Sequence, residues 1–194
     1  MTVRSPGRPR SEAARHAILG AATALIDEQG YGATTMEGIA RRAAVSKQTI
    51  YRWWPSPAAI VLEALNEGAS RIAPAAETSD LDHDLRLFVR RSVLGARGKV
   101  ARLLTALMAE AQRDESFAES FREGFLAQRR AVMRELLHRA RSRGQLQAGV
   151  DIDFLIEMFY GALWYRLLAA SGPINQRFAD DLTDSLLVLA QRGR

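Results

Sequence analysis

The chain has 194 residues, 47% apolar and 25% charged, which allows one large or two small globular domains with a sizeable core. It has no cysteine, which excludes disulfides, thiolate metal sites, a cysteine nucleophile and a thiol redox sensor. The formal net charge is +5, and residues 1–60 account for +4 of it, with eight basic and four acidic residues. This distribution is typical of a module that binds a polyanion and is attached to a nearly neutral body.

Residues 1–10 carry three arginines, two prolines and a glycine, and we expect them to form a flexible basic arm. The arm either has no role or places Arg8 and Arg10 along a DNA backbone or in its minor groove. Ser11 can cap a first helix, which ends before Gly30 because glycine readily forms the left-handed stop.

Two short helices follow at a spacing that is typical of DNA-binding proteins. Thr34 and Glu37 fit a capping box for a helix over residues 35–43. After a tight turn, Ser46 can cap a third helix over about residues 47–54. Two small helices joined by three or four residues form the shape that places a helix in the DNA major groove.

A fourth helix is expected from Pro57, with Ser56 as its cap, and residues 74–80 have the composition of a linker. Beyond the linker every segment has helical periodicity, and no alternating strand pattern occurs. We therefore predict an all-α fold with about nine helices. The later helices are expected at about residues 81–96, 99–113, 116–143, 152–170 and 175–191.

The helix expected over residues 152–170 is apolar around nearly its whole circumference, and such a helix must be buried on more than one side. We expect one side to face a second copy of the chain, with the helix over residues 175–191 adding a weaker apolar stripe. The alternative is the central helix of a monomeric bundle. The candidate dimer-interface residues are Phe159, Leu163, Leu167, Phe178, Leu182, Leu186 and Leu189.

The segment from Ser11 to Leu65 contains the motifs Gly30-Tyr31-Gly32, Ala33-Thr34-Thr35, Ile39-Ala40, Ala43-Ala44-Val45-Ser46 and Thr49-Ile50-Tyr51-Arg52-Trp53-Trp54. With these motifs it resembles the DNA-binding domain of the TetR family (TetR/AcrR-like) of bacterial transcriptional regulators. The resemblance implies a helix-turn-helix DNA-binding domain with three helices over residues 11–70, after the arm. It also implies a C-terminal helical domain for effector binding and dimerisation over residues 71–194.

Two positions depart from the pattern of that family. Many members have glycine where this chain has Ala44, and a Cβ there adds strain if the turn requires a positive φ. Many also begin the fourth helix with a lysine that contacts a DNA phosphate. Here Pro57 occupies that place, so only the N–H groups of the helix N-terminus remain for a phosphate.

Binding to any duplex requires cations and hydrogen-bond donors that face phosphate, whereas reading a sequence requires side chains at base edges. Lys47, Gln48 and Thr49 lie in the first turn of the third helix, where they can contact guanine, adenine and thymine respectively. For each side chain the alternative is an ordinary solvated helix face. The DNA-binding candidates are Thr34, Thr35, Arg41, Arg42, Ser46, Lys47, Gln48, Thr49, Tyr51, Arg52 and Trp53.

The resemblance also implies a small-molecule cavity in the C-terminal domain, and aromatic and methionine side chains between helices suit an apolar one. The same residues could instead fill the core. The candidate lining residues are Phe88, Leu107, Met108, Phe121, Phe125, Met133, Tyr160 and Trp164.

We expect no enzymatic activity, no cofactor and no metal. The three histidines His16, His83 and His138 are far apart and have no metal-ligand spacing. No serine–histidine–aspartate grouping, glycine-rich phosphate loop or paired-carboxylate motif occurs. The first residues lack an apolar run typical of a secretory signal, and residues 152–170 contain three charges, so we expect a cytoplasmic protein without a membrane span.

Together these features predict a homodimeric transcriptional regulator, a repressor that binds a pseudo-palindromic DNA operator and is released by a small-molecule effector. Two alternatives stay open. One is a constitutive DNA-binding factor, which a cavity of roughly several hundred Å³ would oppose. The other is an all-α carrier or enzyme with a vestigial DNA-binding fold, which absent duplex binding would favour.

Overall fold

The computed structural model describes residues 12–72, 78 and 80–191, and this part of the chain contains helices and no strand. The prediction of an all-α fold is confirmed. The basic arm over residues 1–10, the cap expected at Ser11 and most of the expected linker lie outside the described residues. The chain divides into two compact units between Ala64 and Leu65, within the fourth helix.

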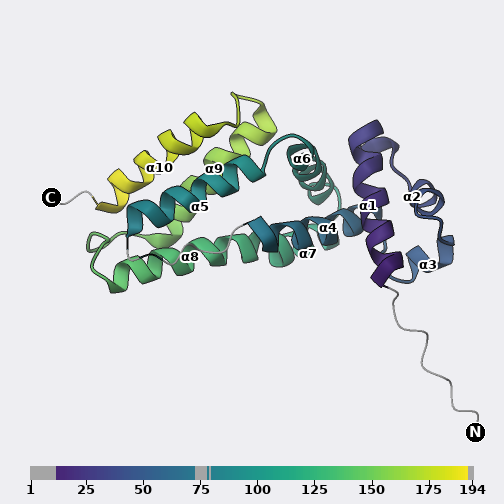
Figure 1. Ribbon diagram of the computed structural model, residues 1–194, viewed down its shortest axis with the longest axis horizontal. Coiled ribbons are helices and arrows are strands. Elements are labelled where there is room, and N and C mark those ends of the chain that lie inside the picture. The colour runs from purple at the N-terminus through teal and green to yellow at the C-terminus, as the bar shows by residue number, and fades with distance from the viewer. Residues whose placement is uncertain (1–11, 73–77, 79, 192–194) are drawn as a thin grey trace, which may run out of the picture. The chain divides into compact units, whose positions relative to one another are not determined.

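The N-terminal unit is built on four helices that each bury one face. Ile18 of the first helix, Ile39 of the second, Ile50 of the third and Ile60 of the fourth are all buried. Burial of each such side chain removes apolar surface from water and is worth about 1.5–3 kcal/mol. Its helices, labelled in Figure 1, are α1 (Glu12–Gln29), α2 (Met36–Arg42), α3 (Lys47–Tyr51) and the first half of α4 (Pro57–Ile72). A 3₁₀ turn, η1 (Tyr31–Ala33), lies between α1 and α2.

The second helix begins one residue later than the capping box predicts. The Thr34 side chain is buried and its hydroxyl donates to the carbonyl of Gly30, at 2.9 Å. Thr35 is the actual cap, because its hydroxyl oxygen accepts the N–H of Gly38 at 3.1 Å. The 3₁₀ turn before α2 turns Thr34 inward, and the predicted capping box of Thr34 with Glu37 is therefore wrong.

The third helix is capped as the sequence predicts, because the Ser46 hydroxyl oxygen accepts the N–H of Thr49 at 3.2 Å. It is shorter than expected and ends at Tyr51. Trp53 and Trp54 lie in a following turn, in which both residues donate their N–H groups to the carbonyl of Ile50. This turn buries Trp54 and leaves Trp53 exposed.

The C-terminal unit contains a helical run that replaces the single long helix expected over residues 116–143. A π-helical turn, η2 (Arg122–Leu126), interrupts it between α7 (Glu115–Phe121) and α8 (Ala127–Ser142). A π turn rotates the residues that follow it, which a uniform helical period does not reveal. The remaining helices are α5 (Leu81–Gly95), α6 (Lys99–Ala111), α9 (Ile152–Ala169) and α10 (Gln176–Gln191).

Helices α5 and α10 lie side by side in this unit (Figure 1). Two ion pairs join them, Arg86 with Asp184 at 2.8 Å and Arg90 with Asp180 at 2.7 Å. The hydrogen bond from the Arg90 guanidinium holds the pKa of the Asp180 carboxyl below its usual range. Because these groups remain partly exposed, the apolar contact between the helices contributes more than the charges do.

The turn between α2 and α3 contains the strain that the sequence suggests. Ala44 has a φ of +53°, in the left-handed region that costs a residue with a Cβ about 1–2 kcal/mol. Glycine avoids that cost but loses about 0.5–1 kcal/mol of backbone entropy on folding. The turn geometry therefore favours glycine at this position.

We predict that Ala44→Gly stabilises the N-terminal unit by about 0.5–1 kcal/mol. Urea unfolding followed by the fluorescence of Trp53 and Trp54, in a shared Trp164→Phe background, measures the change. The matched control is Ala43→Gly, because Ala43 has an ordinary φ of −80° and should lose stability instead. Equal effects of the two substitutions would contradict strain at Ala44.

Candidate nucleic-acid interface

Helix α3 presents a polar face to solvent and a single apolar side chain to the core. Ile50 is fully buried, whereas Lys47, Gln48, Tyr51 and Arg52 are exposed. The exposed set combines two cations, an amide and a phenol within six consecutive residues of α3 and its C-terminal end. These are the groups that hydrogen-bond to phosphates and to the edges of bases.

Two of the basic candidates have acidic partners inside the unit. The Lys47 ammonium lies 2.9 Å from a Glu37 carboxylate oxygen, and this hydrogen bond lowers the pKa of Glu37. The Arg42 guanidinium binds both carboxylate oxygens of Glu28, at 2.5 and 2.6 Å, which raises the pKa of Arg42. All four groups are solvent-exposed, so a phosphate can compete for both cations at small cost.

The hydroxyl candidates are largely used in local structure. Thr34 is buried and bonded to a carbonyl, and therefore its side chain cannot reach DNA, which corrects that expectation. Thr35 caps α2. The hydroxyls of Ser46 and Thr49 lie 2.8 Å apart, bonded to each other at the start of α3. The side chains of these three residues, Thr35, Ser46 and Thr49, therefore stabilise the N-terminal ends of α2 and α3.

Beyond the end of α3, an aromatic and a cation lie together on the surface. The Arg52 guanidinium carbon is 5.3 Å from the centre of the Trp53 ring, a cation–π arrangement. Tyr51 and Trp53 are about half exposed. Arg41, at the end of α2, is also exposed. This group extends the polar surface from α3 toward the first residues of α4.

A second exposed surface lies on α9, where large apolar side chains face solvent. Phe154, Met158, Tyr165 and Leu168 are 36–65% exposed. Their spacing, with the exposed Gly161 between them, places them on one stripe of the helix. Val188 and Leu189 of α10 are also exposed. Clusters of exposed apolar side chains are typical of interaction sites.

The dimer-interface residues expected from the sequence fall mostly on the other side of these helices. Phe159, Leu163, Phe178 and Leu186 are buried within the protomer, and they stabilise its own core. Leu167 and Leu182 are half-buried, and only Leu189 is exposed among the seven. The four buried residues are therefore corrected to core positions. The helix is apolar all round, and the sequence did not reveal which face each residue occupies.

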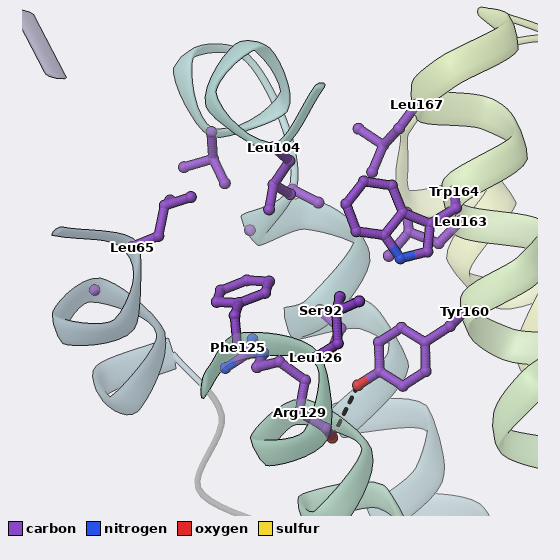
Figure 2. A pocket seen from close by; sticks show the side chains of 14 residues that line it. Leu65, Ser92, Leu104, Phe125, Leu126, Arg129, Tyr160, Leu163, Trp164 and Leu167 are labelled. Atoms are coloured by element: carbon purple, nitrogen blue, oxygen red, sulfur yellow. Dashed lines mark hydrogen bonds between the residues drawn. The ribbon is translucent and has the colours of Figure 1, made fainter. Parts of the chain in front are cut away.

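A cavity of about 100 Å³ lies within the C-terminal unit. Figure 2 shows Tyr160 and Trp164 of α9 on one side of it, Leu65 and Phe125 on the opposite side, and Ser92 of α5 between them. A second cavity of about 260 Å³ shares Leu126, Tyr160 and Trp164 with the first as a common wall. Its other lining residues include Met108, Arg130 and Gly161.

Four of the eight cavity residues expected from the sequence line one of these two cavities: Met108, Phe125, Tyr160 and Trp164. Phe88, Leu107, Phe121 and Met133 are fully or nearly fully buried in the core and line neither of these two cavities. The cavity of about 100 Å³ is also lined by three residues that were not expected from the sequence, Ser92 of α5, Leu104 of α6 and Arg129 of α8. Ser92 could have been noticed, because it is a serine on the stripe of α5 that was expected to be buried.

Two family models match the chain. The model described as "Bacterial regulatory proteins, tetR family" matches residues 18–64, and "Tetracyclin repressor-like, C-terminal domain" matches residues 75–186. The chain belongs to the TetR family of bacterial transcriptional regulators. It is a DNA-binding transcriptional regulator and not an enzyme, and the family resemblance read from the helix-turn-helix motifs is confirmed.

Relatives and solved structures agree with this membership. The HTH-type transcriptional regulator YdeS of Bacillus subtilis is 34% identical over 91% of this chain and 89% of its own length. The DNA-binding transcriptional repressor TetR of Mycobacteroides abscessus is 30% identical over 95% of this chain and 97% of its own. The crystal structure of the TetR family transcription regulator SCO0332 has a TM-score of 0.74 at 34% identity, covering 90% and 96% of the two chains.

Regulators of the TetR family bind DNA operators and small-molecule effectors and act as dimers. Helices α2 and α3 lie within residues 18–64, which match the tetR family model, and Lys47 pairs there with Glu37. No helix in the described part of the chain is both long and apolar enough to cross a membrane.

We predict that Glu37→Gln strengthens binding to random duplex DNA, because it frees Lys47 for phosphate. One additional phosphate contact steepens the slope of log affinity against log salt by about 0.9. Fluorescence anisotropy of a labelled duplex across a salt series measures this slope. The control is Glu119→Gln on α7, an exposed acid of the other unit that should leave the slope unchanged. Equal slopes for wild type and Glu37→Gln would show that Glu37 does not keep Lys47 from a phosphate.

Proposed function

We propose that the protein is a homodimeric, cytoplasmic repressor whose two α3 helices enter successive major grooves of a pseudo-palindromic operator. The exposed polar face of α3, anchored by buried Ile50, is the observation that carries this proposal. A helix held in this way presents its first turn outward, and in helix-turn-helix proteins that turn contacts the bases.

Within this proposal the side chains of α3 have separate roles. Gln48 reads a base edge, and its amide suits adenine N6 and N7. Tyr51, Arg52 and Trp53 lie further along, where a phenol, a guanidinium and an indole N–H suit phosphate oxygens. Arg41 contributes a further charge from the end of α2. In this proposal Gln48 determines which sequence is bound, whereas the residues that contact phosphate bind a duplex of any sequence.

The dimer in this proposal forms through the exposed stripe of α9 together with α10. Phe154, Met158, Tyr165 and Leu168 would be covered by the same residues of a second copy, as a two-fold interface requires. Helices α9 and α10 contact each other in the protomer, so two copies can form a four-helix arrangement. Such a dimer supplies the paired α3 helices that a pseudo-palindrome needs.

Effector control in this proposal depends on the cavities of the C-terminal unit. The cavity of about 100 Å³ is smaller than most ligand sites, which span roughly 300–1,000 Å³. It shares the side chains of Leu126, Tyr160 and Trp164 with the neighbouring cavity of about 260 Å³, and displacement of these three would join the two spaces. An effector releases DNA only if it favours the conformation that binds the operator less tightly.

We predict that Gln48→Ala weakens binding to the cognate operator by about 1–3 kcal/mol and has little effect on random DNA. Tyr51→Phe is the matched comparison, because loss of a phosphate contact weakens binding to both duplexes alike. The operator is first selected from a random duplex pool, and titrations then measure both variants on both duplexes. Equal losses for Gln48→Ala on the two duplexes would refute base reading, and absent duplex binding by the wild type would refute the proposed function.

We predict that Met158→Arg separates the dimer, because it places a charge in the middle of the apolar stripe. Met158 is exposed in the protomer, so the substitution should leave folding intact, which circular dichroism checks. Sedimentation velocity should show a monomer for this variant and a dimer for Gln128→Arg, an exposed control position on α8. A dimer that persists in Met158→Arg would remove this stripe from the interface.

A further inference from the structure

Ser92 on α5 has a buried hydroxyl that lacks a hydrogen-bond partner among the described residues. The residue is 8% exposed and lines the cavity of about 100 Å³. A serine within a helix usually bonds back to a carbonyl one turn earlier, and a buried hydroxyl without a partner is unfavourable. The hydroxyl therefore has an unused capacity to donate or accept a hydrogen bond at the wall of this cavity.

The surroundings of Ser92 are apolar. Leu65, Leu104 and Leu163 belong to the wall, and Figure 2 shows Phe125 on the far side. The only hydrogen bond drawn between the residues of Figure 2 is that from the Tyr160 hydroxyl to the backbone carbonyl of Arg129, at 2.9 Å. A water molecule in a cavity needs two to four polar partners, and this mainly apolar wall offers too few of them. A ligand with an apolar body and one oxygen suits the cavity better.

The cavity also lies beside an irregularity of the helical backbone. Phe125 and Leu126, which line it, belong to the π-helical turn η2, and Arg129 follows on α8. Such turns insert a residue into a helix and occur often at functional sites. The π turn and the unpartnered hydroxyl come from different helices and meet at the same cavity, so they are independent observations.

We propose that the cavity binds a compact, uncharged and mainly apolar molecule whose single hydroxyl or carbonyl oxygen hydrogen-bonds to Ser92. This inference rests on the proposed effector function and specifies the chemistry of the effector. The cavity is close in size to one of about 150 Å³ that takes up benzene, which suggests a single ring as the apolar body.

An anionic ligand fits this wall less well, although Arg129 belongs to it. Burial raises the pKa of Tyr160 to about 12, although the Arg129 and Arg130 guanidiniums act in the opposite direction, so on balance the surroundings of its hydroxyl disfavour a negative charge. The Arg129 guanidinium carbon lies 6.0 Å from the centre of the Phe125 ring, and Figure 2 shows its nitrogen atoms beside that ring, away from Ser92. A carboxylate bonded to Ser92 would therefore lack the nearby cation.

The test compares phenol with toluene, which have the same number of non-hydrogen atoms and differ in one hydroxyl. Calorimetric titration of the full chain at neutral pH should show phenol binding roughly 3–10-fold more tightly than toluene. In Ser92→Ala the preference should fall to about one, with toluene binding at least as tightly as before. Ser120→Ala, a serine-to-alanine change at an exposed position of α7, is the control and should keep the preference.

A second measurement needs no ligand. Because Ser92→Ala removes a buried hydroxyl without a partner, its melting temperature should equal that of the wild type or exceed it by about 2–4 °C. A clear decrease would mean that the hydroxyl has a structural partner, and it would overturn the inference. An equal affinity of the wild type for phenol and toluene, no phenol binding, or tightest binding of benzoate would also overturn it.

The effector function itself is tested separately, by adding the same ligands to the complex with the selected operator. Release of DNA by phenol in the wild type but not in Ser92→Ala supports both proposals. A phenol preference that depends on Ser92, without any change in operator affinity, supports the assignment of the cavity and refutes the effector role. Release by other molecules through a Ser92-independent site supports effector control and refutes the assignment of this cavity.

Discussion

The polar surface proposed to contact DNA depends on the anchoring of a five-residue helix, α3, that could not exist alone. An isolated helix of this length is unstable, because its first turn costs more entropy than its few hydrogen bonds return. Three contacts hold α3 in place: the buried Ile50 side chain, the Ser46 cap and the following turn that buries Trp54. The Trp54 indole donates to Glu63 at 2.7 Å, and Glu63 also binds Arg15 of α1 at 2.6 Å. The half-buried carboxylate of Glu63 thereby ties the end of the helix-turn-helix to α1 and α4, and the orientation of every exposed side chain on α3 follows from these few contacts.

The electrostatics of the same surface show that its positive charge is partly balanced within the unit. Glu37 and Glu28 each bind a cation, yet all of these groups are exposed and such pairs contribute little to stability. Exchange of a carboxylate for a phosphate is therefore inexpensive for Lys47 and Arg42. The acids lower the affinity for duplexes of any sequence, and this increases the relative weight of base contacts such as that proposed for Gln48. A balanced surface of this kind favours discrimination between sequences over tight binding to all of them.

Local side-chain chemistry predicted the parts of the fold that depend on neighbours in the sequence, and it failed where tertiary contacts decide. The Ser46 cap and the positive φ of Gly30 follow from residue type alone, and both are present, although the ψ of Gly30 is 164° and not that of a left-handed helical stop. Thr34 was misassigned because a 3₁₀ turn, which has no strong sequence signal, shifts the start of α2 by one residue.

Helix α9 shows a larger limit of prediction from sequence. Its apolar residues cover the whole circumference, and nothing in the pattern distinguishes buried Phe159 from exposed Tyr165. Only the arrangement of α5, α8 and α10 around it separates the core face from the face left to a partner.

Ala44 and Ser92 are both locally unfavourable, but their surroundings differ: those of Ala44 give the cost a structural origin, and those of Ser92 point to function. Ala44 has a positive φ because the turn between α2 and α3 must reverse the chain within a few residues, and glycine would meet that demand better. No ligand is needed to explain it. Ser92 differs, because alanine would satisfy the buried stripe of α5 equally well and the hydroxyl adds an unpaired polar group. A second unusual feature, the π-helical turn at Phe125, lies on the opposite wall of the same cavity. Because sequences depart from local rules mainly at functional sites, the coincidence of these two departures is the strongest physical argument that the cavity binds a ligand.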